Sequence, residues 1–243
     1  MIADFLTVMW KEWKEILEQG GARGRMGLVI IVGVFGIFLP LQMGRAWVES
    51  PVALVYWAWV PLFLVISVVA DSFAGERERH TLESLLATRL SDRTILFGKA
   101  GAAIGYGWGL TMISLLLGLV TVNLAFGRGE ILLYPTAVGL GSVGLSLMGA
   151  GLAASGGVLV SLRAATARQA QQTLSLAVML LFLVPVFGLQ ALPEEWKLRL
   201  GQAFASTDAA TLVAISIGFL ATVNIGLMAA AMARFQRPRL ILD

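Results

Sequence analysis

The sequence contains no cysteine and one histidine, His80. The absence of cysteine excludes a disulfide framework and a thiolate site, and the scarcity of histidine removes the commonest transition-metal ligand. We therefore expect no protein metal site. A phosphate-cradling loop is absent too, because Gly98 and Lys99 are followed by Ala100 and lack the earlier glycine of the pattern G-x-x-x-x-G-K-[ST]. The chain is thus not expected to hydrolyse ATP itself.

Other catalytic patterns are also missing. The one histidine lies in a charged stretch, so no serine–histidine or paired-carboxylate arrangement falls within an apolar site. The long apolar stretches carry no ionisable residue at membrane depth, where an ion-coupled transporter usually needs one. We expect no catalytic residue and no cofactor bound by this chain. An ion-coupled secondary transporter is therefore a disfavoured alternative.

Apolar residues dominate what is present. Of the 243 residues, 58% are hydrophobic and 14% are charged, and the mean hydropathy is +0.82. A soluble domain of this size has no core large enough to bury so much apolar surface, so we predict that the chain lies in a bilayer. Six stretches approach the roughly 20 residues that a helix needs to cross about 30 Å of hydrocarbon. The prediction is an all-α membrane protein, a single transmembrane domain over 1–243 with spans at 26–44, 53–74, 96–126, 135–160, 173–192 and 209–233.

The first 22 residues follow a different pattern. Large apolar side chains recur at steps of three and four, which places them on one face of a helix with charged residues opposite. The segment is too short and too charged to span a membrane. We predict an amphipathic helix over 1–22 that lies flat at the membrane interface, and packing on a soluble partner is the alternative. Its apolar face consists of Ile2, Phe5, Leu6, Met9, Trp13, Ile16 and Leu17.

Lysine and arginine are distributed unevenly among the connections between spans. With the amino terminus inside the cell, fourteen of the 18 basic residues fall on the inner side and four on the outer side. Cytoplasmic loops carry such an excess. We expect a multi-pass protein of the cell inner (plasma) membrane with both termini in the cytoplasm. Residues 193–208 would then form a short helix on the outer side, since apolar residues recur there at every fourth position.

Small and neutral polar residues mark two further features of the spans. The third span has glycines at every fourth position, including Gly105 and Gly109, and such rows let helix backbones approach closely. Asn123 in the third span and Asn224 in the sixth are amides at membrane depth. Each of these four residues is predicted to serve either helix packing or a substrate path.

Charged residues concentrate between the second and third spans, in the stretch 71–99. Thr81 is a predicted cap of a short helix, and Ser91 is a predicted cap of the helix that becomes the third span, with Asp92 in its first turn. The short helix has a leucine stripe that a solvated loop would leave without a burial site. We therefore predict that this helix docks on another surface. The stripe consists of Leu82, Leu85, Leu86 and Leu90.

This stretch resembles the cytoplasmic signature of the type-2 ATP-binding-cassette (ABC) exporter permeases, approximately E-x-E-x-G-T-L-E-x-L-L-x-T-P followed further on by G-K. His80 stands where glycine is usual in that pattern, and Arg89 stands where proline is usual. The layout is similar as well, with an amphipathic amino-terminal helix, six spans and an outer segment before the last span. The matching residues are Glu76, Glu78, Thr81, Leu82, Glu83, Leu85, Leu86, Thr88, Gly98 and Lys99.

The resemblance implies a permease subunit that exports a substrate by alternating access. In that family the loop, here 75–95, holds a coupling helix on a separate ATPase subunit, and two permease subunits pair with two ATPases, which bind ATP and Mg. We expect no nucleic-acid partner. A non-transporting anchor or assembly subunit of an ABC-type complex is the alternative. The implied docking residues are Glu76, Glu78, Thr81, Leu82, Glu83, Leu85 and Leu86, with the glutamates paired to charges of the ATPase or of the amino-terminal helix.

Overall fold

A computed structural model describes residues 2–19 and 21–235 of the chain. In this part every regular element is helical, and six helices are long and apolar enough to cross a membrane. These findings indicate a multi-pass membrane protein, and they confirm the predicted all-α class and the number of spans. The candidate spans are Met26–Met43, Ala53–Glu78, Asp92–Phe126, Thr136–Ser161, Ala167–Ala191 and Ala209–Arg234.

Two of the spanning helices contain a π-helical turn. α2 (Gly21–Gly33) continues through η1 (Val34–Phe38) into α3 (Leu39–Met43), and α5 (Ala53–Ala70) continues through η2 (Asp71–Gly75) into α6 (Glu76–Glu78). The remaining elements are α1 (Ile2–Gln19), α4 (Ala46–Glu49), α7 (Leu82–Leu86), α8 (Asp92–Phe126), α9 (Thr136–Ser161), α10 (Ala167–Ala191), α11 (Glu194–Ser206) and α12 (Ala209–Arg234).

Two of the spanning helices extend beyond their expected ends, because polar residues next to the apolar runs are helical as well. α10 begins at Ala167, ahead of the expected 173, because the Thr166 hydroxyl accepts a hydrogen bond from the Gln169 N–H and caps a polar first turn. The helix of the second span continues beyond 74 to Glu78. The predicted cap of α8 is confirmed, since the Ser91 hydroxyl accepts a hydrogen bond from the Thr94 N–H at 3.2 Å.

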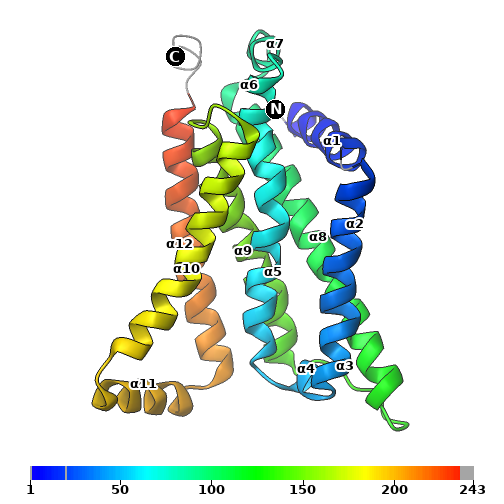
Figure 1. Ribbon diagram of the computed structural model, residues 1–243, viewed down its shortest axis with the longest axis vertical. Helices are drawn as coiled ribbons and strands as arrows, with labels where there is room; N and C mark the ends of the chain where they lie inside the picture. Colours follow the sequence, from blue (N-terminus) through cyan, green and yellow to red (C-terminus); the bar gives the residue numbers. More distant parts are fainter. Residues whose placement is uncertain (1, 20, 236–243) are drawn as a thin grey trace.

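Figure 1 shows how the helices are distributed between the two ends of the bundle. α1, α6 and α7 lie at one end, which we call the α7 end, and α4 and α11 lie at the opposite end. α1 meets α2 at a steep angle, and α11 runs crosswise to α10 and α12. α5 and α9 pack together along the middle of the molecule, with α8 and α12 against them. The positive-inside expectation assigns the α7 end to the cytoplasm, and that assignment stays a prediction.

The contact between α5 and α9 depends on small residues. Gly149 of α9 faces α5, where a Cβ atom would collide with the carbonyl oxygen of Ala58 and would lie 3.3 Å from Pro61. Because the obstacle is backbone rather than a flexible side chain, it cannot move aside without shifting a helix. Gly109 of α8 provides a contrast, since a Cβ there would have no neighbour within 4 Å. The expectation that glycines allow close helix approach therefore applies to Gly149 but not to Gly109.

We predict that Gly149→Ala lowers the thermal unfolding temperature of the purified protein, because the added methyl overpacks the α5–α9 contact at a cost of about 1–3 kcal/mol. Gly109→Ala is the matched control, as it adds the same group to a helix with open space around it. Differential scanning fluorimetry in detergent measures both. Equal melting temperatures for the two variants would contradict the assigned contact.

Candidate functional site

The stretch between the second and third spans starts as an extension of α5 through the π-helical turn η2. A π turn takes N–H groups out of the regular helical hydrogen-bond pattern, and it is often found at functional sites. Here the Ser161 hydroxyl at the end of α9 accepts hydrogen bonds from the N–H groups of Phe73 and Ala74 and donates one to the carbonyl of Ala70. The turn is therefore fixed by the neighbouring helix.

The extended helix ends at a left-handed residue. His80 has φ +57°, its N–H donates to the carbonyl of Arg77, and the N–H of Thr81 donates to the carbonyl of Glu76. These two bonds form a Schellman motif, in which the left-handed position is usually glycine. His80 is also the position where the resembled pattern carries glycine. The substitution therefore leaves the turn intact and places a side chain in a conformation that favours glycine.

α6 is bonded to the turn between α9 and α10. The Arg77 guanidinium donates hydrogen bonds to the carbonyls of Leu162 and Ala164, at 2.9 and 2.7 Å. The Glu78 carboxylate accepts a hydrogen bond from the N–H of Ala167, the first residue of α10. Arginine thus satisfies carbonyls at the end of one helix, and glutamate satisfies an N–H at the start of the next.

A second arginine closes the helix end on itself. Arg79 donates two hydrogen bonds of 3.0 Å to the two carboxylate oxygens of Asp71. The hydrogen bond with Asp71 raises the pKa of Arg79 above its ordinary value, more than burial lowers it. Gly75 lies beside this pair, and a Cβ at that position would collide with the Asp71 carboxylate. These contacts hold residues 71–79 in a compact arrangement, which we call the base of the charged stretch.

The centre of this base is a buried ion pair network around Lys99. The Lys99 side chain is 1% exposed, and its ammonium group lies 2.8 Å from a carboxylate oxygen of Glu76 and 2.8 Å from one of Glu12. The ammonium also lies 5.5 Å from the ring centroid of Phe73. Three elements meet there, because Glu12 belongs to α1, Glu76 to α6 and Lys99 to α8. Burying an ammonium group without such partners would be strongly unfavourable, and the two carboxylates offset that cost.

Two more charged residues of α1 extend the network toward the surface. Lys11 lies 3.0 Å from Glu15 and 3.5 Å from Glu76. Burial alone lowers the pKa of Lys11, but the hydrogen bond to Glu15 and the charges on Glu12 and Glu76 raise it above its ordinary value. The cluster holds three carboxylates and two ammonium groups, which leaves one negative charge. One oxygen of Glu76, Oε2, is buried without a hydrogen-bond partner.

The carboxylates of this cluster have a geometry that suits a cation. Oxygens of Glu12, Glu15 and Glu76 all lie within 4.8 Å of one another. Carboxylate oxygens are the ligands that hard divalent cations prefer. In this structure the ammonium groups of Lys99 and Lys11 lie among them. The cations that these oxygens contact are therefore side chains of the chain itself.

α1 is seated on the glycines of α8. A Cβ at Gly98 would lie 2.5 Å from Val8, one at Gly101 would lie 3.3 Å from Phe5, and one at Gly105 would lie 3.6 Å from Trp13. The Trp13 indole also donates a hydrogen bond to the carbonyl of Ala102. Of the two alternatives predicted for Gly105, the structure therefore shows helix packing. The adjacent residues Gly98 and Lys99 combine close approach with ion pairing.

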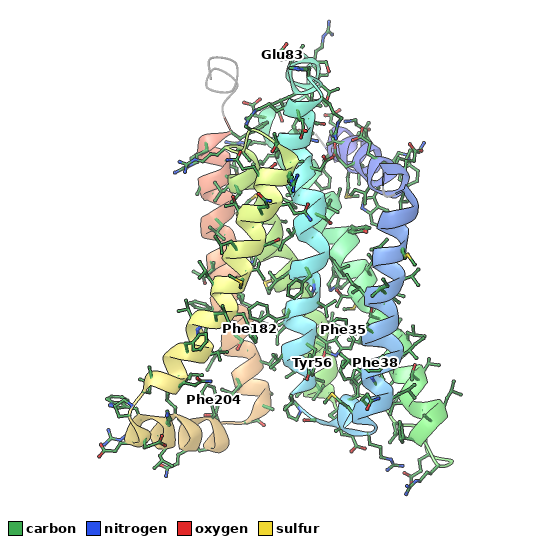
Figure 2. The ribbon with its side chains drawn as sticks, in the orientation of Figure 1. Phe35, Phe38, Tyr56, Glu83, Phe182 and Phe204 are labelled. Atoms are coloured by element: carbon green, nitrogen blue, oxygen red, sulfur yellow. The ribbon has the colours of Figure 1, made fainter. Side chains whose placement is uncertain are left out.

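The leucine stripe that follows has an intramolecular partner. Leu82 is 5% exposed and belongs to the largest hydrophobic core, and Leu85 and Leu90 pack against that core. The side chain of Leu86 lies outside the described residues. The expectation that these leucines would lack a burial site within the chain is thus corrected for Leu82, Leu85 and Leu90, because the core beneath α7 buries the first and contacts the other two. Glu83 is exposed at the tip of α7 (Figure 2).

The predicted docking residues consequently fall into two groups. Glu76, Glu78 and Leu82 are engaged within the chain, as is the Thr81 hydroxyl, which donates to the carbonyl of Glu76 at 3.2 Å. Glu76 forms an ion pair with Lys11 of α1, and it shares Lys99 with Glu12 of the same helix. The expected partnership of Glu76 with the amino-terminal helix is therefore observed. Glu83 is directed outward. Docking on a separate protein stays a prediction.

The two predicted amides are both engaged in contacts within the chain. Asn123 donates to the carbonyls of Leu119 and Leu132 and accepts from the N–H of Leu132, which fastens the loop after α8. Asn224 of α12 donates to the carbonyl of Met148 of α9 and accepts from the Ser155 hydroxyl. Asn224 also lines a small apolar cavity of about 410 Å³. Their hydrogen bonds favour the packing alternative.

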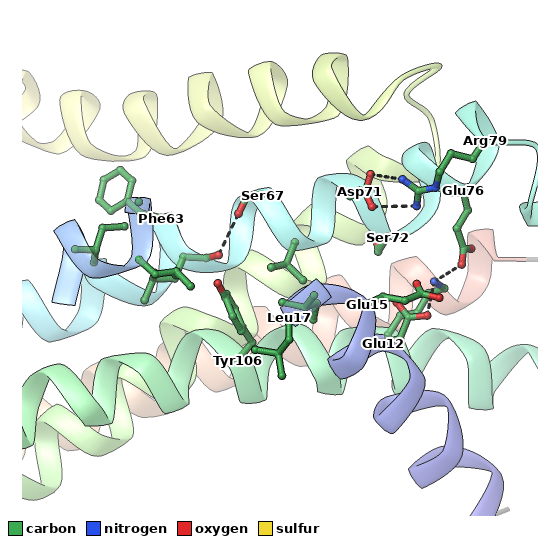
Figure 3. A pocket seen from close by; sticks show the side chains of 17 residues that line it. Glu12, Glu15, Leu17, Phe63, Ser67, Asp71, Ser72, Glu76, Arg79 and Tyr106 are labelled. Carbon is green, nitrogen blue, oxygen red and sulfur yellow. Dashed lines mark hydrogen bonds and ion pairs between the residues drawn. The ribbon is translucent and has the colours of Figure 1, made fainter. Parts of the chain in front are cut away.

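A larger cavity of about 800 Å³ lies between α1, α2, α5, η2, α6 and α8. Figure 3 shows its two ends. Glu12, Glu15 and Glu76 lie at the charged end, and Phe63 lies far from them at the apolar end. Phe63 is 58% exposed, so the cavity reaches the molecular surface there. Its volume is in the range of small-molecule sites in proteins, about 300–1,000 Å³.

Sequence reasoning expected a charge of the amino-terminal helix as a partner of Glu76, but it missed the pairing of Glu76 with Lys99 and the cavity beside them. It placed Lys99 at the end of a charged loop and Glu12 on a membrane-surface helix, and the two residues are far apart in the chain. Val8 and Glu12 lie one helical turn apart on α1 and are both buried, but burial is a property of the folded chain that the sequence does not display. Val8 contacts the same row of α8 glycines as Phe5 and Trp13, so Glu12 lies at the edge of the apolar face of α1.

Comparison with known proteins adds no assignment. No protein-family model matches the chain, and a search of curated proteins finds no match. The function is therefore inferred from the pattern of residues 76–99 and from the geometry of the α7 end.

We predict that His80→Gly stabilises the protein by about 1 kcal/mol, because glycine adopts the left-handed conformation without the steric cost that a side chain incurs. The measurement is the thermal unfolding temperature. His80→Ala is the control, since it removes the imidazole but keeps the Cβ atom. An equal rise for both variants would mean that the imidazole, and not the backbone, is the source of strain.

We further predict that Lys99→Met destabilises the protein by about 3 to 5 kcal/mol, because it leaves Glu12 and Glu76 buried without a counter-charge. Adding Glu12→Gln and Glu76→Gln to Lys99→Met should recover most of the loss, since the buried charges are then removed together. Lys14→Met, which removes an exposed lysine of the same neighbourhood, serves as the control. Chemical unfolding in detergent measures all three. If the triple variant is as unstable as the single one, lost packing rather than unpaired charge is responsible.

Proposed function

We propose that this chain is the membrane-spanning permease subunit of an ATP-driven ABC exporter, and that a separate ATPase subunit docks on its α7 end. The observation that carries the proposal is the placement of α7. This short helix projects from the bundle between two spans, and its base is tied to α1, α8 and the α9–α10 turn. The resemblance of residues 76–99 to the exporter-permease signature is the reason for proposing an ATPase subunit as the partner.

The proposed mechanism is a rigid-body transfer of motion. The chain between α5 and α7 contains no flexible linker, because the Schellman motif at His80 connects them directly. α8 begins six residues after the end of α7 and is capped by Ser91. Closure of the ATPases would displace α7, and α5 and α8 would follow because they are joined to it at both sides. Such shifts of packed helices are a common form of conformational switching.

We restrict the proposed docking surface to side chains of α7 that are not engaged within the chain. Because Leu82 lies in the core and Glu76 lies in the ion network, neither presents its side chain to a partner in this conformation. The contact is therefore assigned to the exposed tip, with Glu83 and Ser84 at its centre and Leu85 at its edge. ATP and Mg would be bound by the ATPase and not by this chain.

The remaining parts of the proposal concern assembly and placement. Two copies of the permease, or this chain and a second permease, would pair with two ATPase subunits in the cell inner membrane, with both termini in the cytoplasm. The outward faces of α10 and α12 are largely apolar and exposed, so they offer contact surfaces to lipid and to a second permease. A non-transporting assembly subunit would use the same docking tip, and transport by the reconstituted pair distinguishes the two functions.

We predict that Glu83→Lys reduces copurification of the proposed ATPase subunit by at least about fivefold. The reversal places a lysine against the basic residue of the ATPase that would pair with Glu83, which costs on the order of 1 kcal/mol or more. The measurement is the yield of ATPase retained by affinity-tagged permease from membranes. Membrane insertion of the permease is checked in parallel by its yield.

Glu195→Lys provides the matched control for this experiment. It makes the same charge reversal at an exposed position of α11, at the opposite end of the bundle. Copurification should be unchanged by Glu195→Lys. Retention of the ATPase at full yield by Glu83→Lys and also by Leu85→Glu would refute docking on α7.

A further inference from the structure

The cavity between α1, α2, α5 and α8 has an electrostatic polarity. Its walls include the carboxylates of Glu12, Glu15, Asp71 and Glu76, against the cationic groups of Arg79 and Lys99. Lys11 does not line the cavity, but its ammonium group forms an ion pair with Glu15. Four carboxylates and three cationic groups leave one negative charge. Figure 3 shows Glu12, Glu15, Asp71, Glu76 and Arg79 together at one end of the cavity.

The rest of the cavity wall is apolar or aromatic. Leu28 and Ile31 of α2, Phe63 of α5 and Leu17 of α1 surround it, and Tyr106 of α8 lies between the two ends (Figure 3). Leu17 and Phe63 are both exposed to the surface of the molecule. An amphipathic molecule dissolved in a bilayer therefore has an apolar route into the cavity from the side.

Glu76 provides an observation independent of the net charge. This residue is 4% exposed, and its Oε2 atom is buried without a hydrogen-bond donor, although its Oε1 atom is bonded to Lys99. A buried carboxylate oxygen without a donor is costly, since it has lost its hydration without replacement. Glu76 lines the cavity, so its carboxylate belongs to the charged wall that a bound cation would face.

We infer that the cavity binds an amphipathic primary ammonium, with its ammonium group at the Glu15–Glu76 end and its apolar body between α2 and α5. The net negative charge at one end favours a cation, the carboxylates that line that end accept hydrogen bonds from N–H donors, and the apolar end favours a hydrophobic body. Within the proposed function this ligand is the class of substrate that the permease exports. The binding site itself does not require the ATPase.

The test uses dansylcadaverine, a primary ammonium with an apolar fluorescent body, and the full-length chain in lipid nanodiscs. Energy transfer from tryptophan to the dansyl group reports binding, and nanodiscs without protein supply the background. N-acetyl-dansylcadaverine keeps the body but has no charge. We expect saturable binding of the amine and an affinity about tenfold lower for the acetylated probe, which corresponds to about 1.4 kcal/mol.

Three variants locate the binding. Glu15→Gln should weaken binding of the amine about tenfold, whereas Glu18→Gln, which removes the same charge from an exposed position of α1 outside the cavity, should leave it within about twofold. Ser67→Phe fills the cavity from an accessible position on α5 and should abolish binding of both probes. Equal affinity for the amine and its acetylated form, equal effects of Glu15→Gln and Glu18→Gln, or unchanged binding by Ser67→Phe would each overturn the inference.

The outcome is separable from that of the proposed function. Binding is measured on the chain without its ATPase, and docking is measured by copurification without a ligand. If the chain does not bind the amine but still retains the ATPase, the substrate class is overturned and the permease proposal stands. The opposite result overturns docking on α7 and leaves an amine-binding membrane protein.

Discussion

The buried ammonium group of Lys99 is the constraint on which the α7 end depends. A charge at that depth requires two short carboxylate contacts, and these come from helices that are distant in sequence. Satisfying Lys99 therefore fixes α1 against α8 and fixes α6 against both. The glycines of α8 allow this approach, since Val8 occupies the space that a side chain at position 98 would need. Without the ion pairs, α1 would be held chiefly by contacts of its apolar side chains.

The parts of the structure that could be predicted from sequence are those determined by local pattern. Runs of apolar residues define the six spans, and the serine at position 91 defines the start of α8 because capping acts within one turn. Two features go beyond the apolar pattern of the sequence. α10 begins earlier than its apolar run because a polar first turn is still helical, and Leu82 is buried by a core that forms only when α5, α8 and α9 are assembled.

The candidate site shows the same division. Glu76 and Lys99 were recognised from a sequence pattern, but their pairing with Glu12 could not be, since nothing in a linear sequence specifies which glutamate of an amphipathic helix faces inward. His80 illustrates the reverse case. A histidine in place of glycine is expected to disrupt a turn, yet the backbone keeps the left-handed conformation because the hydrogen bonds from residues 80 and 81 hold it. A Schellman motif requires the left-handed conformation at this position, whereas glycine is only the residue most often found there.

Glu76 links the two proposals physically. It belongs to the rigid piece that carries α7, and it also lines the large cavity. A cation that enters the cavity competes with Lys99 and Lys11 for the same carboxylates, so it alters the contacts that hold α6 against α1 and α8. If ligand binding changes the position of α7 in this way, docking of the ATPase must change ligand affinity by the same factor, because coupling between two binding equilibria is reciprocal. A single ion network beneath α7 therefore suffices to let an occupied cavity and a docked ATPase influence each other without a separate sensor.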